Sequence, residues 1–316
     1  MILEKNGVGY HTYRIPGLVR TERGTLIAYY ECRASLSDWA QIDLKVVRST
    51  DGGAHWDDVM ILAGHGATLN NPVMITDGET VHFLYCKNYK ELFYCRSTDD
   101  GAHFSEPVNK SAAFERADIS YTVAAVGPGH GIKHGSNLLA PVWFADNPEN
   151  EKAHHPSYIS TIVSDDGGES FRVGEIIGRA LFRDASECAL AIMPDGSILN
   201  SIRNVNAEKR RGLAVSANGF SDWQDVRLEP TLPDPVCMGS MTHLDGVIWH
   251  INCNSETKRE NLTVRVSRDG MKTFESIPIA DVAAYSDIAV SRDTLYILYE
   301  GEGGLHFITR KNEAFL

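Results

Sequence analysis

The sequence predicts an all-β protein, specifically a six-bladed β-propeller of four-stranded antiparallel blades. The first observation is a repeated turn, because residues 48–56 read RSTDGGAHW and residues 96–104 read RSTDDGAHF. The second is that short β-branched and aromatic runs bounded by turn residues fill the chain, whereas no segment shows a sustained apolar period of 3.6 residues. A self-similar unit of about 40 to 50 residues is typical of propeller blades.

The repeated turn follows the frame Ser-x-Asp-x-Gly-x-x-aromatic, in which the carboxylate accepts backbone hydrogen bonds and the glycine permits a left-handed backbone. Its copies span residues 49–56, 97–104, 164–171, 216–223 and 267–274, and their serines lie 48, 67, 52 and 51 residues apart. Asn218 replaces the aspartate of the fourth copy and Met271 the glycine of the fifth, which leaves those two turn geometries open. Five copies and a final stretch without one predict six blades.

Each copy follows an expected strand, so we place it between the third and fourth strands of its blade. Strands are expected at residues 24–31, 42–49, 80–86, 92–97, 196–203, 262–267 and 294–300. Loops from every blade of a propeller converge at the mouth of its central tunnel. Catalytic residues should therefore be spread along the whole chain.

The composition favours one globular propeller domain over residues 1–316, with 43% hydrophobic residues. The net charge of −12 argues against nucleic acid or an anionic membrane surface as a partner. No apolar run approaches 18 residues, so no transmembrane helix is expected. The N-terminus lacks the features of a signal peptide, which fits a cytoplasmic protein or a chain that has lost its leader.

The cysteines and histidines indicate neither a metal nor a cofactor. The six cysteines contain no C-x-x-C pair, and a reduced chain is expected, although Cys86 and Cys95 flank a hairpin and could form a disulfide. His154 and His155 lack a third ligand at suitable spacing, so a zinc site is not expected.

One short motif near the start points to a family. Tyr13-Arg14-Ile15-Pro16, followed by the repeated Asp-containing turns, resembles the sialidase (neuraminidase) superfamily of bacterial-type exo-α-sialidases. The resemblance covers essentially residues 10–310. The turns alone would indicate only the fold, because unrelated propellers also carry them.

The resemblance implies a set of site residues, each matched to a motif of this sequence. These are Arg14 in YRIP, Arg33 in ECR, Asp38 in SDWAQIDL, Glu187 in ASECALAIMPDGS, Arg203 in SIRN, Arg259 in KRENLTV, Tyr285 in AAYSDIAV and Glu300 in LYE. It assigns substrate-carboxylate binding to three arginines (Arg14, Arg203 and Arg259), and a contact with a hydroxyl of the sugar to Arg33. Asp38, Glu187 and Tyr285 are the catalytic residues it implies, and Glu300 supports Arg14.

The implied function is an exo-α-sialidase that releases terminal α-linked sialic acid from a glycoconjugate, with retention and with a tyrosine nucleophile. The substrate carboxylate would repel an anionic nucleophile, so a neutral tyrosine suits the reaction. Three alternatives stay open: transfer or anhydro-sugar formation at the same site, hydrolysis of another anionic sugar such as deaminated sialic acid, and a non-catalytic binding propeller. The sequence does not determine the linkage preference, the N-acyl group, the compartment or the oligomeric state.

Overall fold

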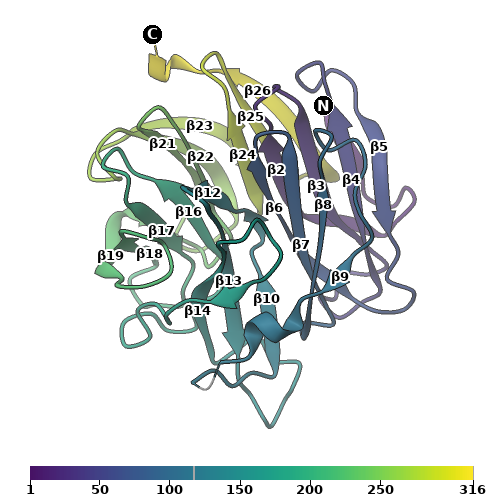
Figure 1. The fold of residues 1–316 in the computed structure, drawn as a ribbon. Coiled ribbons are helices and arrows are strands. Elements are labelled where there is room, and N and C mark those ends of the chain that lie inside the picture. The colour runs from purple at the N-terminus through teal and green to yellow at the C-terminus, as the bar shows by residue number, and fades with distance from the viewer. Residues whose placement is uncertain (117, 316) are drawn as a thin grey trace.

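A computed structural model describes residues 1–116 and 118–315. These residues form six sheets, which are the blades of a propeller (Figure 1). The predicted fold class is confirmed. The first three blades contain, from the inner to the outer strand, β2 (Thr12–Arg20), β3 (Leu26–Arg33), β4 (Ile42–Ser49) and β5 (Asp57–Leu62); β6 (Leu69–Asp77), β7 (Thr80–Lys87), β8 (Glu91–Ser97) and β9 (Val108–Asn109); and β10 (Val123–Val126), β13 (Asn137–Ala145), β14 (Ser157–Ser164) and β15 (Arg172–Val173).

The remaining blades follow the same plan, and the last one joins the two ends of the chain. They contain β16 (Cys188–Ile192), β17 (Ile198–Ile202), β18 (Arg210–Ser216) and β19 (Gln224–Pro233); β20 (Ser240–Leu244), β21 (Val247–Cys253), β22 (Glu260–Ser267) and β23 (Glu275–Val282); and β24 (Ser286–Val290), β25 (Thr294–Gly301), β26 (Gly304–Lys311) and β1 (Ile2–Lys5). Short 3₁₀ helices occupy Ser111–Phe114 and Glu313–Phe315. Each of the seven expected strands overlaps an observed one, although those expected at 24–31 and 196–203 extend beyond β3 and β17 by one or two residues.

Closure of the ring explains why the sixth blade lacks the repeated turn. Its outer strand is β1, which pairs antiparallel with β26 in the register Glu4↔Leu305 and Lys5↔Gly304. The third strand of this blade is therefore the last strand of the chain, and the fourth is the first. No turn can connect them.

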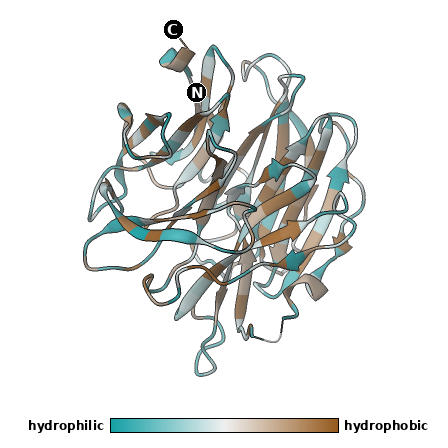
Figure 2. Cartoon of the chain, turned by 60° about the vertical axis from the view of Figure 1, so that its left-hand side comes forward, coloured by the Kyte–Doolittle hydropathy of each residue, from teal (hydrophilic) through white to brown (hydrophobic). Residues whose placement is uncertain are grey.

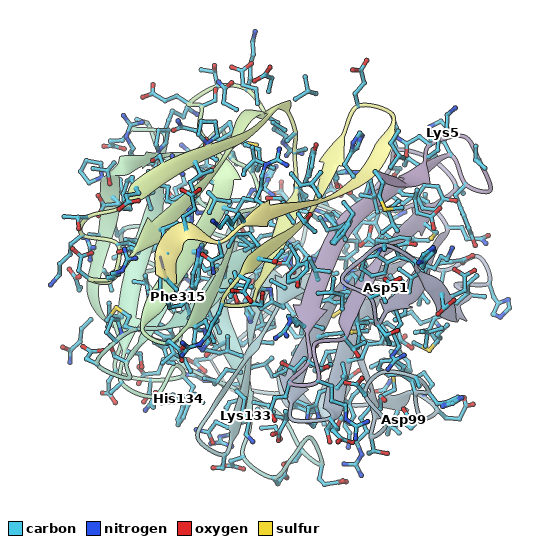
Figure 3. All side chains as sticks on the ribbon, turned by 90° about the horizontal axis from the view of Figure 1, so that it is seen from above. Lys5, Asp51, Asp99, Lys133, His134 and Phe315 are labelled. Atoms are coloured by element: carbon cyan, nitrogen blue, oxygen red, sulfur yellow. The ribbon has the colours of Figure 1, made fainter. Side chains whose placement is uncertain are left out.

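The five turns connect the third and fourth strands, as predicted. In the first, Ser49 Oγ accepts a hydrogen bond from the N–H of Gly53 at 2.9 Å, and Asp51 Oδ1 accepts one from the N–H of His55 at 3.0 Å. Gly53 has a φ of 90°, and a Cβ there would lie 2.2 Å from the ring of Phe307 in the neighbouring blade. The glycine thus serves both the turn and the contact between blades. Asp51 and its second-blade counterpart Asp99 are labelled in Figure 3.

Both substituted copies keep a backbone hydrogen bond to the serine Oγ, but only the fifth keeps the full turn geometry. Met271 adopts a φ of 67°, and its N–H still donates to Ser267 Oγ at 2.9 Å. In the fourth copy the donor to Ser216 Oγ is the N–H of Gly219 at 3.0 Å, so this turn is one residue shorter than the frame predicts. Asn218 Oδ1 accepts backbone hydrogen bonds as the aspartates do.

The apolar residues lie along the strands, and polar residues gather in the loops (Figure 2). All six cysteines are buried and free, so the alternative of a Cys86–Cys95 disulfide is wrong. The register explains this, because Cys95 lies opposite Phe83 whereas Cys86 lies opposite Leu92 on the same pair of strands. None of the described helices is long and apolar enough to cross a membrane.

The inner strand of the third blade is broken in a way that places a histidine near the propeller axis. β10 and β12 (Ile132–His134) pair with β13, whereas β11 (Gly129–His130) between them pairs in parallel with β6 of the second blade. This detour brings His130 within 2.8 Å of the buried carboxylate of Asp287 in β24.

The Asp287 carboxylate connects the inner strands of several blades through hydrogen bonds. Its Oδ1 accepts hydrogen bonds from His130 Nδ1 and from Ser240 Oγ at 2.5 Å, and its Oδ2 accepts one from the N–H of Leu18 at 2.8 Å. These partners belong to β11, β20 and β2, so one carboxylate connects four sheets. Burial lowers the pKa of His130, but the Asp287 carboxylate raises it, and the net shift of the pKa is upward.

We predict that His130→Gln lowers the stability of the protein by about 2 kcal/mol near pH 6, because a buried carboxylate loses its charged partner. Because the pKa of His130 is higher in the folded than in the unfolded state, its protonation stabilises the folded protein. This stabilisation is fully present below the unfolded pKa of about 6.5 and is lost as the pH rises through the folded pKa. Urea unfolding of both proteins between pH 5.5 and 9 measures this. The exposed pair of His103 and Asp99 supplies the control, His103→Gln. A cost of His130→Gln that grows with pH would contradict the account.

Candidate active site

The implied site residues lie at one edge of the propeller, which we call the site face. Inner strands begin there, second strands end there and third strands begin there, because neighbouring strands are antiparallel. Arg14 lies near the start of β2 and Arg33 ends β3, while Arg259 directly precedes β22. Glu187 and Tyr285 directly precede the inner strands β16 and β24. Residues from four blades therefore meet at one face.

Seven of the eight implied residues line a single cavity of about 230 Å³ on this face. They are Arg14, Arg33, Asp38, Glu187, Arg203, Arg259 and Tyr285. The eighth, Glu300, lies behind Arg14. We call this space the site cavity.

Tyr285 and Glu187 form the centre of the site cavity. The hydroxyl of Tyr285 donates a hydrogen bond to Glu187 Oε1 at 2.5 Å, and Arg203 Nη1 donates to the Tyr285 hydroxyl at 2.7 Å and also to Glu187 Oε2. Burial raises the pKa of Tyr285 well above its usual range, although Arg203 opposes this. Tyr285 is thus neutral at pH 7 and has a carboxylate in place to accept its proton.

Arg14 and Arg259 complete a ring of guanidiniums around Tyr285. Their central carbons lie 5.2 and 5.3 Å from the centre of the Tyr285 ring. Arg14 is held by two parallel bonds to Glu300, from Nε at 3.1 Å and from Nη2 at 3.3 Å. Arg259, by contrast, forms no ion pair among the described residues, and its guanidinium is available to a ligand.

Arg33 and Asp38 form a second charged group. Arg33 is buried and donates from Nη1 to Asp38 Oδ1 at 2.7 Å, while its other nitrogens bind the buried carboxylate of Glu31. Burial alone would raise the pKa of Asp38. The nearby Arg33 guanidinium, with smaller contributions from other charges, lowers the pKa by more, so the net shift is downward. Asp38 is therefore ionised at neutral pH in the free protein.

The structure adds a backbone feature that the sequence reasoning missed. Ile15 has a φ of 56°, which is strained for a β-branched residue, and the register of β2 shifts there. The N–H of Ile15 donates to Glu300 Oε1 at 2.9 Å. Asn71 repeats this arrangement in β6, with a φ of 54° and its N–H donating to Glu31 Oε1 at 2.8 Å. Both residues precede a proline, and that shared pattern was the available signal.

An aromatic wall of the site cavity was also missed. Tyr89, Trp143 and His154 line the cavity, and the His154 ring centre lies 4.8 Å from that of Tyr89 and 5.3 Å from that of Trp143. Trp39, next to Asp38, packs against Tyr89 at 4.9 Å. These residues come from three blades and share no motif. In residues 1–116 and 118–315, no three His, Cys, Asp or Glu side chains form a group suited to a metal ion.

Fold and site together define a β-propeller with repeated Asp-containing turns and an arginine-rich pocket at one face. The BNR repeat-like domain family matches residues 57–297, and the chain belongs to this family. Its homologues are distant sialidases. A sialidase of Bacteroides fragilis is 25% identical over 91% of this chain, and an exo-alpha-sialidase of Arthroderma benhamiae is 26% identical over 84%. The chain spans 60% and 69% of the lengths of these two relatives.

Solved structures support the same fold. The Hadza microbial sialidase Hz136 has a TM-score of 0.85 at 24% identity, and the match covers 97% of this chain and 67% of that one. A Trypanosoma rangeli sialidase in complex with 2,3-difluorosialic acid, described as a covalent intermediate, has a TM-score of 0.76 at 18% identity and covers 95% and 54%. Identities this low establish the shared architecture alone.

We predict that Glu300→Gln lowers the free energy of unfolding by about 1–3 kcal/mol, because it leaves the partly buried Arg14 without its carboxylate. Urea unfolding at pH 7 measures the change. Glu79→Gln is the matched control, since Glu79 pairs with Arg23 on the exposed surface and such pairs contribute about 0–1 kcal/mol. Equal effects of the two substitutions would show that Arg14 does not depend on Glu300.

Proposed function

We propose that the protein is an exo-α-sialidase that hydrolyses terminal α-linked sialic acid from glycoconjugates with retention of configuration. The observation that carries this proposal is the 2.5 Å hydrogen bond from Tyr285 to Glu187 among the guanidiniums of Arg14, Arg203 and Arg259. The distant homology to sialidases supports it.

The three arginines suit a sugar with a carboxylate on its anomeric carbon. Each guanidinium offers rigid, permanently charged donors, and a charge-assisted hydrogen bond contributes about 1.5–3 kcal/mol. Arg14, Arg203 and Arg259 surround Tyr285, so a carboxylate bound by all three places the anomeric carbon beside the Tyr285 hydroxyl. Glu300 holds Arg14 in this orientation.

Tyr285 acts as the nucleophile in this proposal. Its oxygen forms a bond to the anomeric carbon while its proton passes to Glu187, and the bond to the leaving oxygen breaks. A neutral hydroxyl approaches the substrate carboxylate without the repulsion that a second carboxylate would meet. Tyrosine nucleophiles of sialidases are a known exception among retaining glycosidases.

Asp38 acts as the acid and then the base. It donates a proton to the leaving oxygen. In the second step it takes a proton from a water whose oxygen bonds to the anomeric carbon, while the bond from that carbon to the Tyr285 oxygen breaks and Glu187 returns the proton to that oxygen. Because two displacements occur at that carbon, the configuration is retained.

The acid role requires a change at Arg33. In the free protein Arg33 keeps Asp38 ionised through the 2.7 Å bond. A sugar hydroxyl that accepts a hydrogen bond from the Arg33 guanidinium weakens the bond between Arg33 and Asp38. The bound substrate also buries Asp38, and this burial raises the pKa of the Asp38 carboxyl. Substrate binding thus prepares the acid.

We predict that the wild type releases the fluorophore from an aryl α-sialoside and that Tyr285→Phe loses roughly 10³-fold or more of kcat/KM, because the nucleophile is absent. Fluorescence measures turnover, and proton NMR of the first product identifies its anomeric configuration.

Tyr94→Phe serves as the control, since Tyr94 is buried and hydrogen-bonded to His82 but lies outside the site cavity. Absence of turnover by the folded wild type would reject sialidase activity and favour another anionic sugar or a binding role. Full activity of Tyr285→Phe would reject the nucleophile.

A further inference from the structure

A second cavity of about 660 Å³ adjoins the site cavity. His155, Ser157 and Asp184 line both, so these three residues form the boundary between them. The second cavity continues outward to Tyr158, Arg179 and Phe182. It is more than twice as large as the site cavity, which leaves space for a further sugar.

One run of contacts connects Asp38 with the second cavity. Trp39 follows Asp38 directly, and its Nε1 donates a hydrogen bond to the carbonyl of Lys152 at 3.2 Å. Its ring centre lies 6.0 Å from that of His154. The chain then passes from His154 to His155, at the boundary of the second cavity. The second cavity is thus reached from Asp38 along this segment.

The chemistry of the second cavity centres on Arg179. Its guanidinium carbon lies 4.5 Å from the centre of the Tyr158 ring, and Tyr158 itself is buried. Stacking on a fixed aromatic ring orients the planar guanidinium. In the described part of the chain, no carboxylate lies within ion-pairing distance of Arg179. Its guanidinium is therefore not engaged by a carboxylate of the described chain and can bind one from a ligand.

The lining of the second cavity also carries Arg183 and two carboxylates, Asp146 and Asp184. Arg183 Nε lies 3.5 Å from Asp184 Oδ2, so these two charges offset each other. Asp146 Oδ2 accepts a hydrogen bond from Ser120 Oγ, which orients this carboxylate but leaves its negative charge at the cavity. The buried ring of Phe182 supplies an apolar surface. A guanidinium beside an apolar surface suits an anionic sugar.

We propose that the second cavity binds an acidic sugar adjacent to the one that is released, so that the preferred substrates carry two consecutive sialic acids. This inference rests on the proposed function. Arg179 binds the carboxylate of the second sugar while Arg14, Arg203 and Arg259 bind that of the first.

The test compares kcat/KM of the wild type on an α-linked disialyl oligosaccharide and on monosialyl lactose, with an aryl α-sialoside as the reference. The disialyl substrate is expected to be roughly three- to tenfold better, since Arg179 is solvent-exposed and its bond is screened. Arg179→Gln is expected to remove this preference and to leave aryl sialoside turnover unchanged.

Arg172→Gln is the matched control, because Arg172 is an exposed arginine that pairs with Asp165 away from the cavity. No preference in the wild type, or a preference that survives Arg179→Gln, overturns the inference while aryl sialoside turnover upholds the proposed function. If the wild type hydrolyses none of the three, the proposed function fails. In that case the second cavity is tested by binding alone, through calorimetric titration of the protein with the sialic acid dimer and with the monomer. Tighter binding of the dimer is expected, and equal affinities would overturn the proposed second site.

Discussion

The ion pair between Arg14 and Glu300 joins the first blade to the last, and much of the site depends on it. The two residues are 286 positions apart in the chain, and they meet because β1 completes the blade formed by β24, β25 and β26. The same carboxylate binds the N–H of Ile15 and so fixes the bulge that presents Arg14. Closure of the ring and assembly of the pocket are therefore one structural event. A propeller that failed to close would separate Arg14 from Tyr285.

The pocket must also balance clustered positive charge, and it does so unevenly. Arg14 has Glu300, Arg33 has Glu31 and Arg203 has Glu187, whereas Arg259 has no carboxylate partner in the described chain. The paired arginines are thereby held in place before any ligand arrives, which lowers the entropy cost of binding. The unpaired charge adds to the attraction for an anion. This arrangement suits a ligand that carries one carboxylate, and it supports the proposal that the neutral, hydrogen-bonded Tyr285 acts as the nucleophile.

Much of the fold could be predicted from the sequence, because the repeated turns are local and periodic. Their order gave the number of blades, and the turn chemistry survived even where Met271 replaced glycine. The closure by β1 could not be predicted, since the four residues of this strand carry no periodic signal. The implied site residues came from motifs of a known family, and the structure brings seven of them to one cavity. Glu31, Asn71 and the aromatic wall were missed, because their roles arise only when separate blades pack together.

The most direct test of the central claim is covalent trapping on Tyr285. The protein is incubated with 2,3-difluorosialic acid, digested and examined by mass spectrometry, with Tyr285→Phe treated in parallel. The account predicts one added sialosyl group on the wild-type peptide that contains Tyr285, and none on the variant. A wild type that hydrolyses sialosides yet carries the label on another residue, such as Glu187, would contradict it.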